Sequence, residues 1–252
     1  MIVKTRTTVD FHSNAADPEF AMGEFACLID LDDARAILFD LSGSCVVVDH
    51  VASFMINAVL STNFDRALQN CAARFDAAGE LVRSDLTKLV SDLQKAGLIR
   101  PCGKRAGCIA PVILINGAAA LIGAVMKSRR FRISTLLTFF FFGIRILGLP
   151  ILILACRDYS EKHRRRGTSE QSLDAIDEAV RNSAAGHLLG ISCKERALTS
   201  WALTVDCDLP SRLIFGIQLF PFSAHCWLSI GSRTIGDAAD RSDQFTPVLT
   251  FN

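Results

Sequence analysis

The sequence lacks the signatures of several common protein classes. Its nine cysteines are an odd number and none belongs to a CxxC pair, so neither a disulfide framework nor a zinc knuckle is predicted. No GxxxxGK loop is present, which leaves an ATP-binding role without support. The first twenty residues carry charged and polar groups where a secretory peptide needs an apolar core of about 7 to 15 residues. These absences predict a cytoplasmic protein without a metal ion or a cofactor.

Apolar residues are abundant, and charge is unevenly distributed. Half of the 252 residues are hydrophobic, enough for one large domain or two small ones with cores. The net charge of +1 hides a basic middle, because residues 101–168 carry 12 basic and 2 acidic residues. Residues 1–100 carry a net charge of −5 and residues 169–252 a net charge of −4. Three parts are therefore expected, over 1–100, 101–167 and 168–252.

The first part has the pattern of three strands followed by three helices. β-Branched and aromatic residues separated by turn signals predict strands over about 24–31, 34–40 and 45–49. Of the three helical stripes that follow, the last is expected to be capped by Ser84 and ended by Gly97. This βββααα order is typical of a winged-helix-like module. DNA binding would need a basic face, whereas this part is acidic, so no nucleic acid is expected as a partner.

Two stretches of this part, ARAILFDLSGSCVVVDHVASFMINAVLS and LVSDLQKAGLI, resemble the peptide-recognition domain of the pyrroloquinoline-quinone biosynthesis chaperone (PqqD-like) family. In that family the domain binds a precursor's leader peptide as a strand added beside its third β-strand, against a helix. Backbone hydrogen bonds supply affinity in this mode, and side-chain pockets supply selectivity. The resemblance implies that a leader lies along 45–49 and 84–96. The substrate-binding residues that it implies are Cys45, Val46, Val47, Val48, Leu89 and Leu93.

The basic middle contains two long apolar runs. Residues 108–126 carry no charge and residues 133–156 carry only Arg145, so both lengths fall near the roughly 17 to 25 residues needed to span a bilayer. Every flank is basic, however, and the positive-inside rule then gives no consistent orientation. Buried helices that join the two ends are favoured. Amphipathic helices on an anionic membrane surface and true spanning remain as alternatives.

The last part contains a cysteine at a predicted helix start. Ser192 and Glu195 have the spacing of a capping box, and an apolar helical stripe follows them. Cys193 therefore falls in the first turn, where unpaired backbone N–H groups and the positive end of the helix dipole stabilise a thiolate. This environment prepares a nucleophile, although a small buried apolar residue is the commoner role of cysteine.

A histidine and a carboxylate follow on two predicted strands, AHCWLSIG and RTIGDA. A two-residue loop between these strands would place His225 and Asp237 on opposite faces. We therefore predict a three-residue loop over 230–232, or an equivalent bulge, that sets the two residues directly across from each other. In the resulting triad, His225 takes the proton of Cys193, Asp237 holds the imidazole tautomer, and the thiolate attacks a peptide carbonyl.

The stretch SCKERALTSWAL, followed by SRLIFGIQLFPFSAHCWLSIGSRTIGDAADRSDQF, resembles the transglutaminase-like cysteine protease that matures lasso peptides. In that family the protease removes the leader from a ribosomally made precursor, and a separate asparagine-synthetase-like enzyme uses ATP to close the macrolactam ring. The resemblance implies Cys193 as nucleophile, His225 as base and Asp237 as orienting acid.

The expected architecture is α+β: the winged-helix-like module, a helical apolar connector, and a papain/transglutaminase-like cysteine protease domain. The expected function is to bind and cut the leader of a lasso precursor peptide, in the cytoplasm or at the inner face of the membrane, with the macrolactam cyclase as a partner. Two alternatives remain, a transglutaminase that uses an amine acceptor and a non-catalytic leader-binding scaffold.

Overall fold

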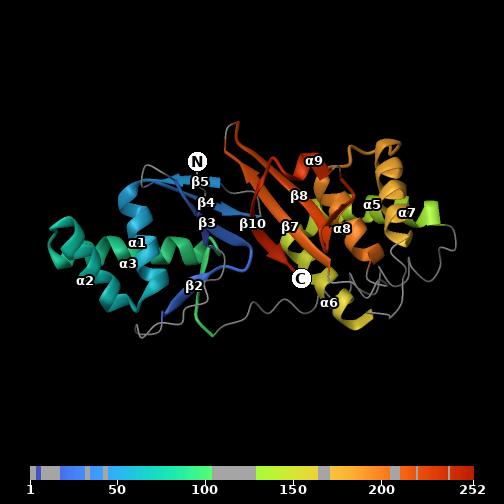
Figure 1. Cartoon of the computed structure of the whole chain (residues 1–252). Helices are drawn as coiled ribbons and strands as arrows, with labels where there is room; N and C mark the ends of the chain where they lie inside the picture. Colours follow the sequence, from blue (N-terminus) through green and yellow to red (C-terminus); the bar gives the residue numbers. More distant parts are fainter. Residues whose placement is uncertain are drawn as a thin grey trace. The chain divides into compact units, whose positions relative to one another are not determined.

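The chain forms two compact units, Met1–Ala106 and Gly107–Asn252, each a mixture of helices and antiparallel sheet (Figure 1). The structure is a computed structural model. It describes residues 4–6, 18–31, 35–41, 45–103, 129–163, 171–204, 211–219, 221–237 and 239–252. The first predicted apolar run, 108–126, and the boundary expected near 167 lie outside the described residues.

A four-stranded antiparallel sheet with the order β1-β3-β4-β5 forms one layer of the first unit. Its strands are β1 (Lys4–Arg6), β3 (Ala26–Asp30), β4 (Ala36–Asp40) and β5 (Cys45–Val48). Separately, β2 (Phe20–Met22) pairs with β6 (Ile99–Pro101). The three predicted strands are confirmed as β3, β4 and β5. The others escaped prediction because three residues are too few to display a period of two.

Three helices share one hydrophobic core with this sheet: α1 (His50–Ser61), α2 (Phe64–Phe75) and α3 (Gly79–Lys95). The prediction that Ser84 caps the third helix is wrong. This helix begins at Gly79, after Ala78, which makes no side-chain cap bond. The extra turn brings the apolar side chain of Val82 into the core, which outweighs the missing cap. The predicted stop is confirmed, because Gly97 adopts a φ of +73°.

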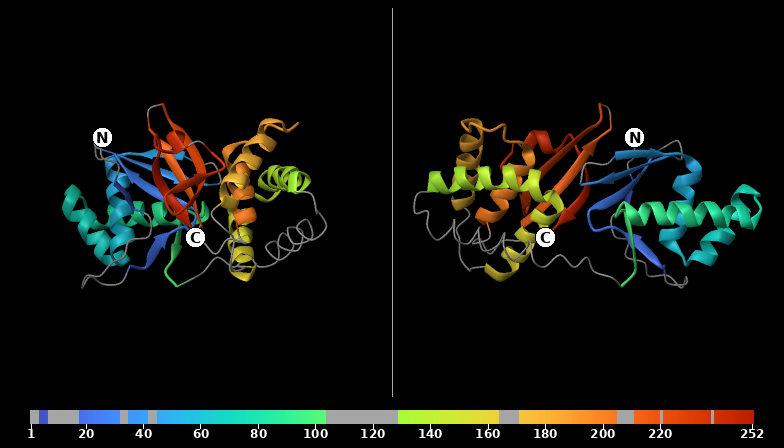
Figure 2. Two further views of the ribbon diagram at one scale, coloured as in Figure 1. Left: turned by 45° about the vertical axis from the view of Figure 1, so that its right-hand side comes forward. Right: turned by 180° about the vertical axis from the view of Figure 1, so that it is seen from behind.

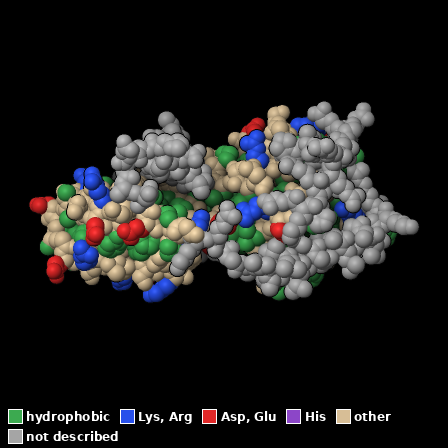
Figure 3. Space-filling view, turned by 90° about the horizontal axis from the view of Figure 1, so that it is seen from below, with side chains coloured by type: hydrophobic (Ala, Val, Ile, Leu, Met, Phe, Trp, Pro, Cys, Tyr) green, Lys and Arg blue, Asp and Glu red, His purple; other side chains and the backbone are tan. Residues whose placement is uncertain are grey.

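The order of three strands and three helices therefore holds from β3 to α3, while the likeness to a winged-helix module stays a prediction. Acidic and basic side chains both lie on the face of this unit that Figure 3 shows. Phosphate binding requires a basic patch, and none is visible on that face.

The second unit is built around one helix, α8 (Cys193–Thr204). It packs on β7 (Ser211–Gln218) and β8 (Ser223–Ile230), and on its other sides against α5 (Arg129–Leu147), α6 (Leu149–His163) and α7 (Gln171–Ala185). The sheet has the order β10-β7-β8-β9, with β9 over Arg233–Ile235 and β10 over Thr246–Phe251. A short helix, α9 (Ala239–Ser242), lies between β9 and β10. The left view of Figure 2 shows α8 between the sheet and α5.

The second apolar run belongs to this unit. Helices α5 and α6 bury one face each, and their buried side chains include Ile133, Leu136, Leu137, Phe140, Leu149, Leu152 and Ile153. Gly148, with a φ of +86°, makes the turn between the two helices. Among the described helices, none combines the length and the hydropathy that crossing a bilayer would need. The described part of the expected connector therefore packs against the helices of the second unit.

The predicted three-residue hairpin loop is wrong. Strand β8 pairs with β9 in the register Ile230↔Arg233, which leaves only Gly231 and Ser232 in the loop. Gly231 takes the positive φ, 61°, that such a tight turn favours. The ladder ends at Ile235, and the backbone turns away after it. The contact between the histidine and the carboxylate is thus made beyond the paired part of the hairpin.

Candidate active site

Helix α8 begins at Cys193, as the capping-box spacing predicts. The Glu195 carboxylate accepts hydrogen bonds from the Ser192 backbone N–H, at 2.9 Å, and from the Ser192 hydroxyl. These bonds fix the residue immediately before the cysteine. Cys193 is partly exposed, at the end of a helix most of whose residues are buried.

The same carboxylate is tied to a second helix. Glu195 is 1% exposed, and its other oxygen lies 3.1 Å from Nη1 of Arg145 on α5. Burial alone would raise the pKa of Glu195, but the hydrogen bonds from Ser192, from backbone N–H groups and from Arg145 outweigh it and lower the pKa. A buried carboxylate thus stays charged and holds the start of α8. Arg145, the single charge of its apolar run, is its ion-pair partner.

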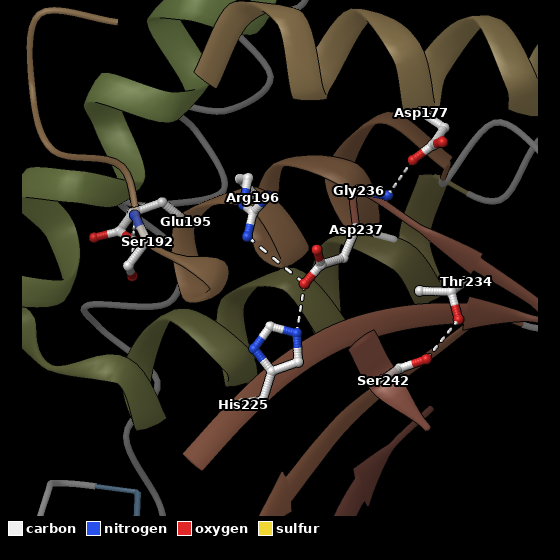
Figure 4. A network of polar contacts seen from close by, with 9 residues as sticks. All are labelled: Asp177, Ser192, Glu195, Arg196, His225, Thr234, Gly236, Asp237 and Ser242. Carbon is white, nitrogen blue, oxygen red and sulfur yellow. Dashed lines mark hydrogen bonds and ion pairs between the residues drawn. The ribbon is translucent and has the colours of Figure 1, made fainter. Parts of the chain in front are cut away.

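His225 and Asp237 form a buried pair (Figure 4). Nε2 of the imidazole contacts Oδ2 of the carboxylate. Since a carboxylate accepts a proton in a hydrogen bond, this contact favours the tautomer with hydrogen on Nε2. Nδ1, on the other side of the ring, is then left as the proton acceptor. Arg196 of α8 also reaches Asp237, with Nη2 at 3.6 Å from Oδ2.

Aromatic side chains enclose the imidazole. Trp227 stacks on His225 with 5.8 Å between ring centroids, and the Phe245 ring lies at 4.9 Å. Gly216, the cross-strand partner of His225, provides the room, because a Cβ there would lie 2.7 Å from the Trp227 ring. Burial lowers the pKa of His225; Arg241 and Arg196 add to this effect, and Asp237 opposes it. The neutral, proton-accepting form is therefore favoured.

Asp237 is positioned by the turn that precedes it. Gly236 has a φ of +82°, and a Cβ there would lie 2.6 Å from Oγ of Ser200 on α8. Its N–H donates to Oδ1 of Asp177 on α7, at 2.5 Å (Figure 4). The turn is thus fitted against two helices at once. Only glycine combines this backbone conformation with this close approach.

The structure brings together two of the three predicted catalytic residues by direct contact. His225 and Asp237 touch, whereas no hydrogen bond joins Cys193 to His225 among the described residues. The two elements that carry them, α8 and β8, pack against each other. Burial raises the pKa of the Cys226 thiol well above its usual value, and Cys193 and Asp237 both raise it further.

The predicted leader-binding residues divide into two sets. On β5, an edge strand of its sheet among the described residues, Val46 is 51% and Val47 57% exposed, and Cys45 is exposed too. Val48 is half-buried. On α3, Leu93 is part of the core and Leu89 packs against that core. Leu93 is therefore a structural residue, and the exposed apolar surface is on the strand.

Three residues of the site were not predicted from the sequence. Arg145 and Arg196 hold Glu195 and Asp237, and Asp177 holds the turn before Asp237. A lone arginine inside an apolar run is the one signal that could have been used, because a charge in such a run needs a partner. The other two lie on ordinary amphipathic helices and carry no such signal. Among the described residues, no cluster of His, Cys, Asp and Glu suits a metal ion.

Residues 138–250 match the Transglutaminase-like superfamily. The match begins within α5, so the later part of α5 and all of α6 belong to it, and it includes Cys193, His225 and Asp237. A transglutaminase-like domain indicates activity of the cysteine protease or acyltransferase type. No curated protein and no solved structure shows significant similarity to the chain.

The Glu195 network makes a prediction about stability. Arg145→Met is expected to lower the free energy of unfolding by about 1 to 3 kcal/mol, because it removes a partner from a buried carboxylate. The measurement is urea unfolding followed by the fluorescence of Trp201 and Trp227, which both lie in this unit. Arg233→Met is the control: its pair with Asp174 is exposed, so the expected change is less than about 0.5 kcal/mol. Equal losses in both variants would contradict this role of Arg145.

The pKa shift of His225 makes a prediction about pH. A histidine whose pKa is lower in the folded protein than in the unfolded chain takes up its proton mainly on unfolding. Wild-type stability should therefore decline as pH falls below about 6.5, the usual histidine value. His225→Gln should flatten this decline, measured by urea unfolding between about pH 7 and pH 5. An unchanged pH dependence in the variant would show that His225 is not the group responsible.

Proposed function

We propose that the protein is a cysteine peptidase that removes the leader from a ribosomally made lasso precursor peptide, so that a partner cyclase can close the macrolactam. The observation that supports this most directly is the buried His225–Asp237 pair on a strand that packs against the helix beginning with Cys193. The sequence resemblance to lasso-peptide proteases supplies the substrate class.

In the proposed acylation step, Nδ1 of His225 takes the proton of the Cys193 thiol, and the sulfur attacks the carbonyl carbon of the scissile peptide bond. Asp237, on Nε2, stabilises the imidazolium that forms. The backbone N–H of Cys193, in the first turn of α8, is unpaired within the helix and can donate to the oxyanion. The imidazolium then protonates the leaving nitrogen, the C–N bond breaks, and a thioester remains.

Water completes the reaction in this proposal. His225 takes a proton from the water as its oxygen attacks the thioester carbon. The C–S bond breaks, the thiol recovers its proton, and the leader leaves as a free acid. An acyltransferase would pass through the same thioester but resolve it with an amine. This second function is supported by the same superfamily match, and the chemical form of the leader product distinguishes the two.

The first unit is the proposed leader-binding site. Strand β5 presents exposed apolar side chains and lies at the edge of its sheet in the described part of the chain. An exposed apolar edge strand is a hazard unless another strand covers it, and an extended peptide is the natural occupant. Joining this site to the proposed nucleophile in one chain raises the concentration of the scissile bond near the thiol. The proposed location is the cytoplasm, where precursor and cyclase are made.

The central test is mass spectrometry of the precursor peptide encoded beside this gene, after incubation with the full-length protein, with and without the cyclase and ATP. Cleavage at one bond, with the leader released as a free acid, is the expected result. A leader joined to an added amine would support the acyltransferase instead. Measurable leader binding without cleavage under any condition would leave a recognition scaffold and overturn the peptidase.

Cys193→Ala should lower the cleavage rate by more than about 10⁴-fold in this assay, because the nucleophile is lost. Cys226→Ala is the matched control. Its thiol is buried, and its raised pKa keeps it protonated, so this variant should retain cleavage within about threefold. If Cys226→Ala were the inactive variant and Cys193→Ala the active one, the assignment of the nucleophile would be wrong.

Val47→Asp should weaken binding of a fluorescently labelled leader peptide at least tenfold, about 1.4 kcal/mol, in an anisotropy titration. The substitution places a carboxylate on the strand edge where the leader would pair. Leu81→Asp is the control, because Leu81 on α3 is 60% exposed and belongs to the same unit. Equal weakening by both variants would place the leader elsewhere. This outcome would leave the test of cleavage unaffected.

A further inference from the structure

Helix α5 carries apolar side chains on two opposite faces. The inner face is buried against the unit and includes Leu136, Leu137 and Phe140. On the outer face Phe131 is 71%, Phe142 48% and Ile146 75% exposed. Spacings of 11 and 15 residues from Phe131 correspond to about three and four helical turns, so the three side chains lie on one face over about 22 Å, with the partly buried Thr135 and Thr138 between Phe131 and Phe142. We call this the outer stripe of α5.

An outer stripe of this kind is unusual for a helix on a protein surface. The neighbouring helix α7 shows the ordinary pattern, with Asp174, Glu178 and Arg181 exposed on its outer face. A helix that is apolar all round is normally covered on both sides. The outer stripe of α5 therefore has the composition of a surface that binds something apolar.

The charge of α5 indicates the nature of that partner. Its 19 residues include four arginines and no acidic residue. Arg145 is paired with Glu195 and lies over the Phe141 ring at 3.3 Å, so its charge is already balanced within the protein. The other three, Arg129, Arg130 and Arg132, occupy the first turn of the helix, where the macrodipole is already positive. This arrangement disfavours the helix unless anions lie near its first turn.

We propose that the outer stripe of α5 docks on an anionic lipid surface, with Phe131, Phe142 and Ile146 inserted at the boundary of the acyl chains and the basic first turn of the helix at the level of the headgroups. An apolar stripe beside a cluster of basic residues is the combination that binds helices parallel to such surfaces. The proposed attachment is peripheral. It does not depend on the proposed peptidase activity.

The test is flotation of the full-length protein with two kinds of vesicle, one of phosphatidylcholine alone and one with phosphatidylglycerol in equal parts. The expected result is binding at least tenfold stronger to the anionic vesicles, which added salt weakens. Binding to neither kind, or equal binding to both, would overturn the proposal. So would capture of the protein by the cyclase through this helix in the absence of any vesicle binding.

Two variants assign the binding to the outer stripe. Phe142→Ser combined with Ile146→Ser should lower binding to anionic vesicles at least tenfold. The control combines Leu188→Ser with Phe222→Ser, two exposed apolar residues of the same unit outside α5, and should bind as the wild type does. Equal loss in both double variants would overturn the assignment. The circular dichroism of each variant should match that of the wild type.

A third variant keeps the proposal falsifiable if the double substitution fails to fold. Phe131→Trp places a fluorophore on the outer stripe, while the native Trp201 and Trp227 are buried. Its emission should shift to shorter wavelength on addition of anionic vesicles and resist an aqueous quencher. No shift, while the protein floats with the vesicles, would mean that another surface binds and would overturn this placement.

Discussion

The second unit depends on one buried carboxylate, that of Glu195. Helix α8 is covered by a sheet on one side and by three helices on the others, so its first turn is the part that chemistry can reach. Glu195 fixes this turn by accepting two hydrogen bonds from Ser192 and an ion pair from Arg145. A charge in such a place is costly unless every partner is present. The position of Cys193 is therefore coupled to the correct packing of α5.

A second constraint acts on the other half of the site. The register of β8 and β9 would leave His225 and Asp237 on different faces, because neighbouring residues of a strand alternate. Because the chain turns at Gly236, one residue before Asp237, the alternation of the strand no longer decides the face on which Asp237 lies. Asp177 and Ser200 hold this turn between α7 and α8. The pairing of imidazole and carboxylate thus depends on tertiary packing more than on the hairpin.

These two constraints explain how far the sequence could be interpreted. The capping box is a local pattern, so the helix start at Cys193 could be predicted from four consecutive residues. The closeness of His225 and Asp237 could also be expected, but through the wrong loop, because a positive φ at Gly236 and its contact with Ser200 are tertiary facts. The same holds for α3, which begins a turn before Ser84 because Val82 is buried. The local sequence patterns predicted the helices and strands, whereas tertiary contacts determined the residues at which these elements begin and end.

The apolar run that includes α5 had three interpretations from its sequence, and the structure gives its two faces different roles. One face is buried against the core of the second unit, which accounts for half of the apolar residues. The other face is the outer stripe, whose apolar side chains add to the hydropathy of the run but are not buried in the core. Arg145 lies at the edge of this stripe and holds the start of α8 through Glu195. Any ligand that covers the outer stripe would therefore lie directly beside the residue that fixes the proposed nucleophile.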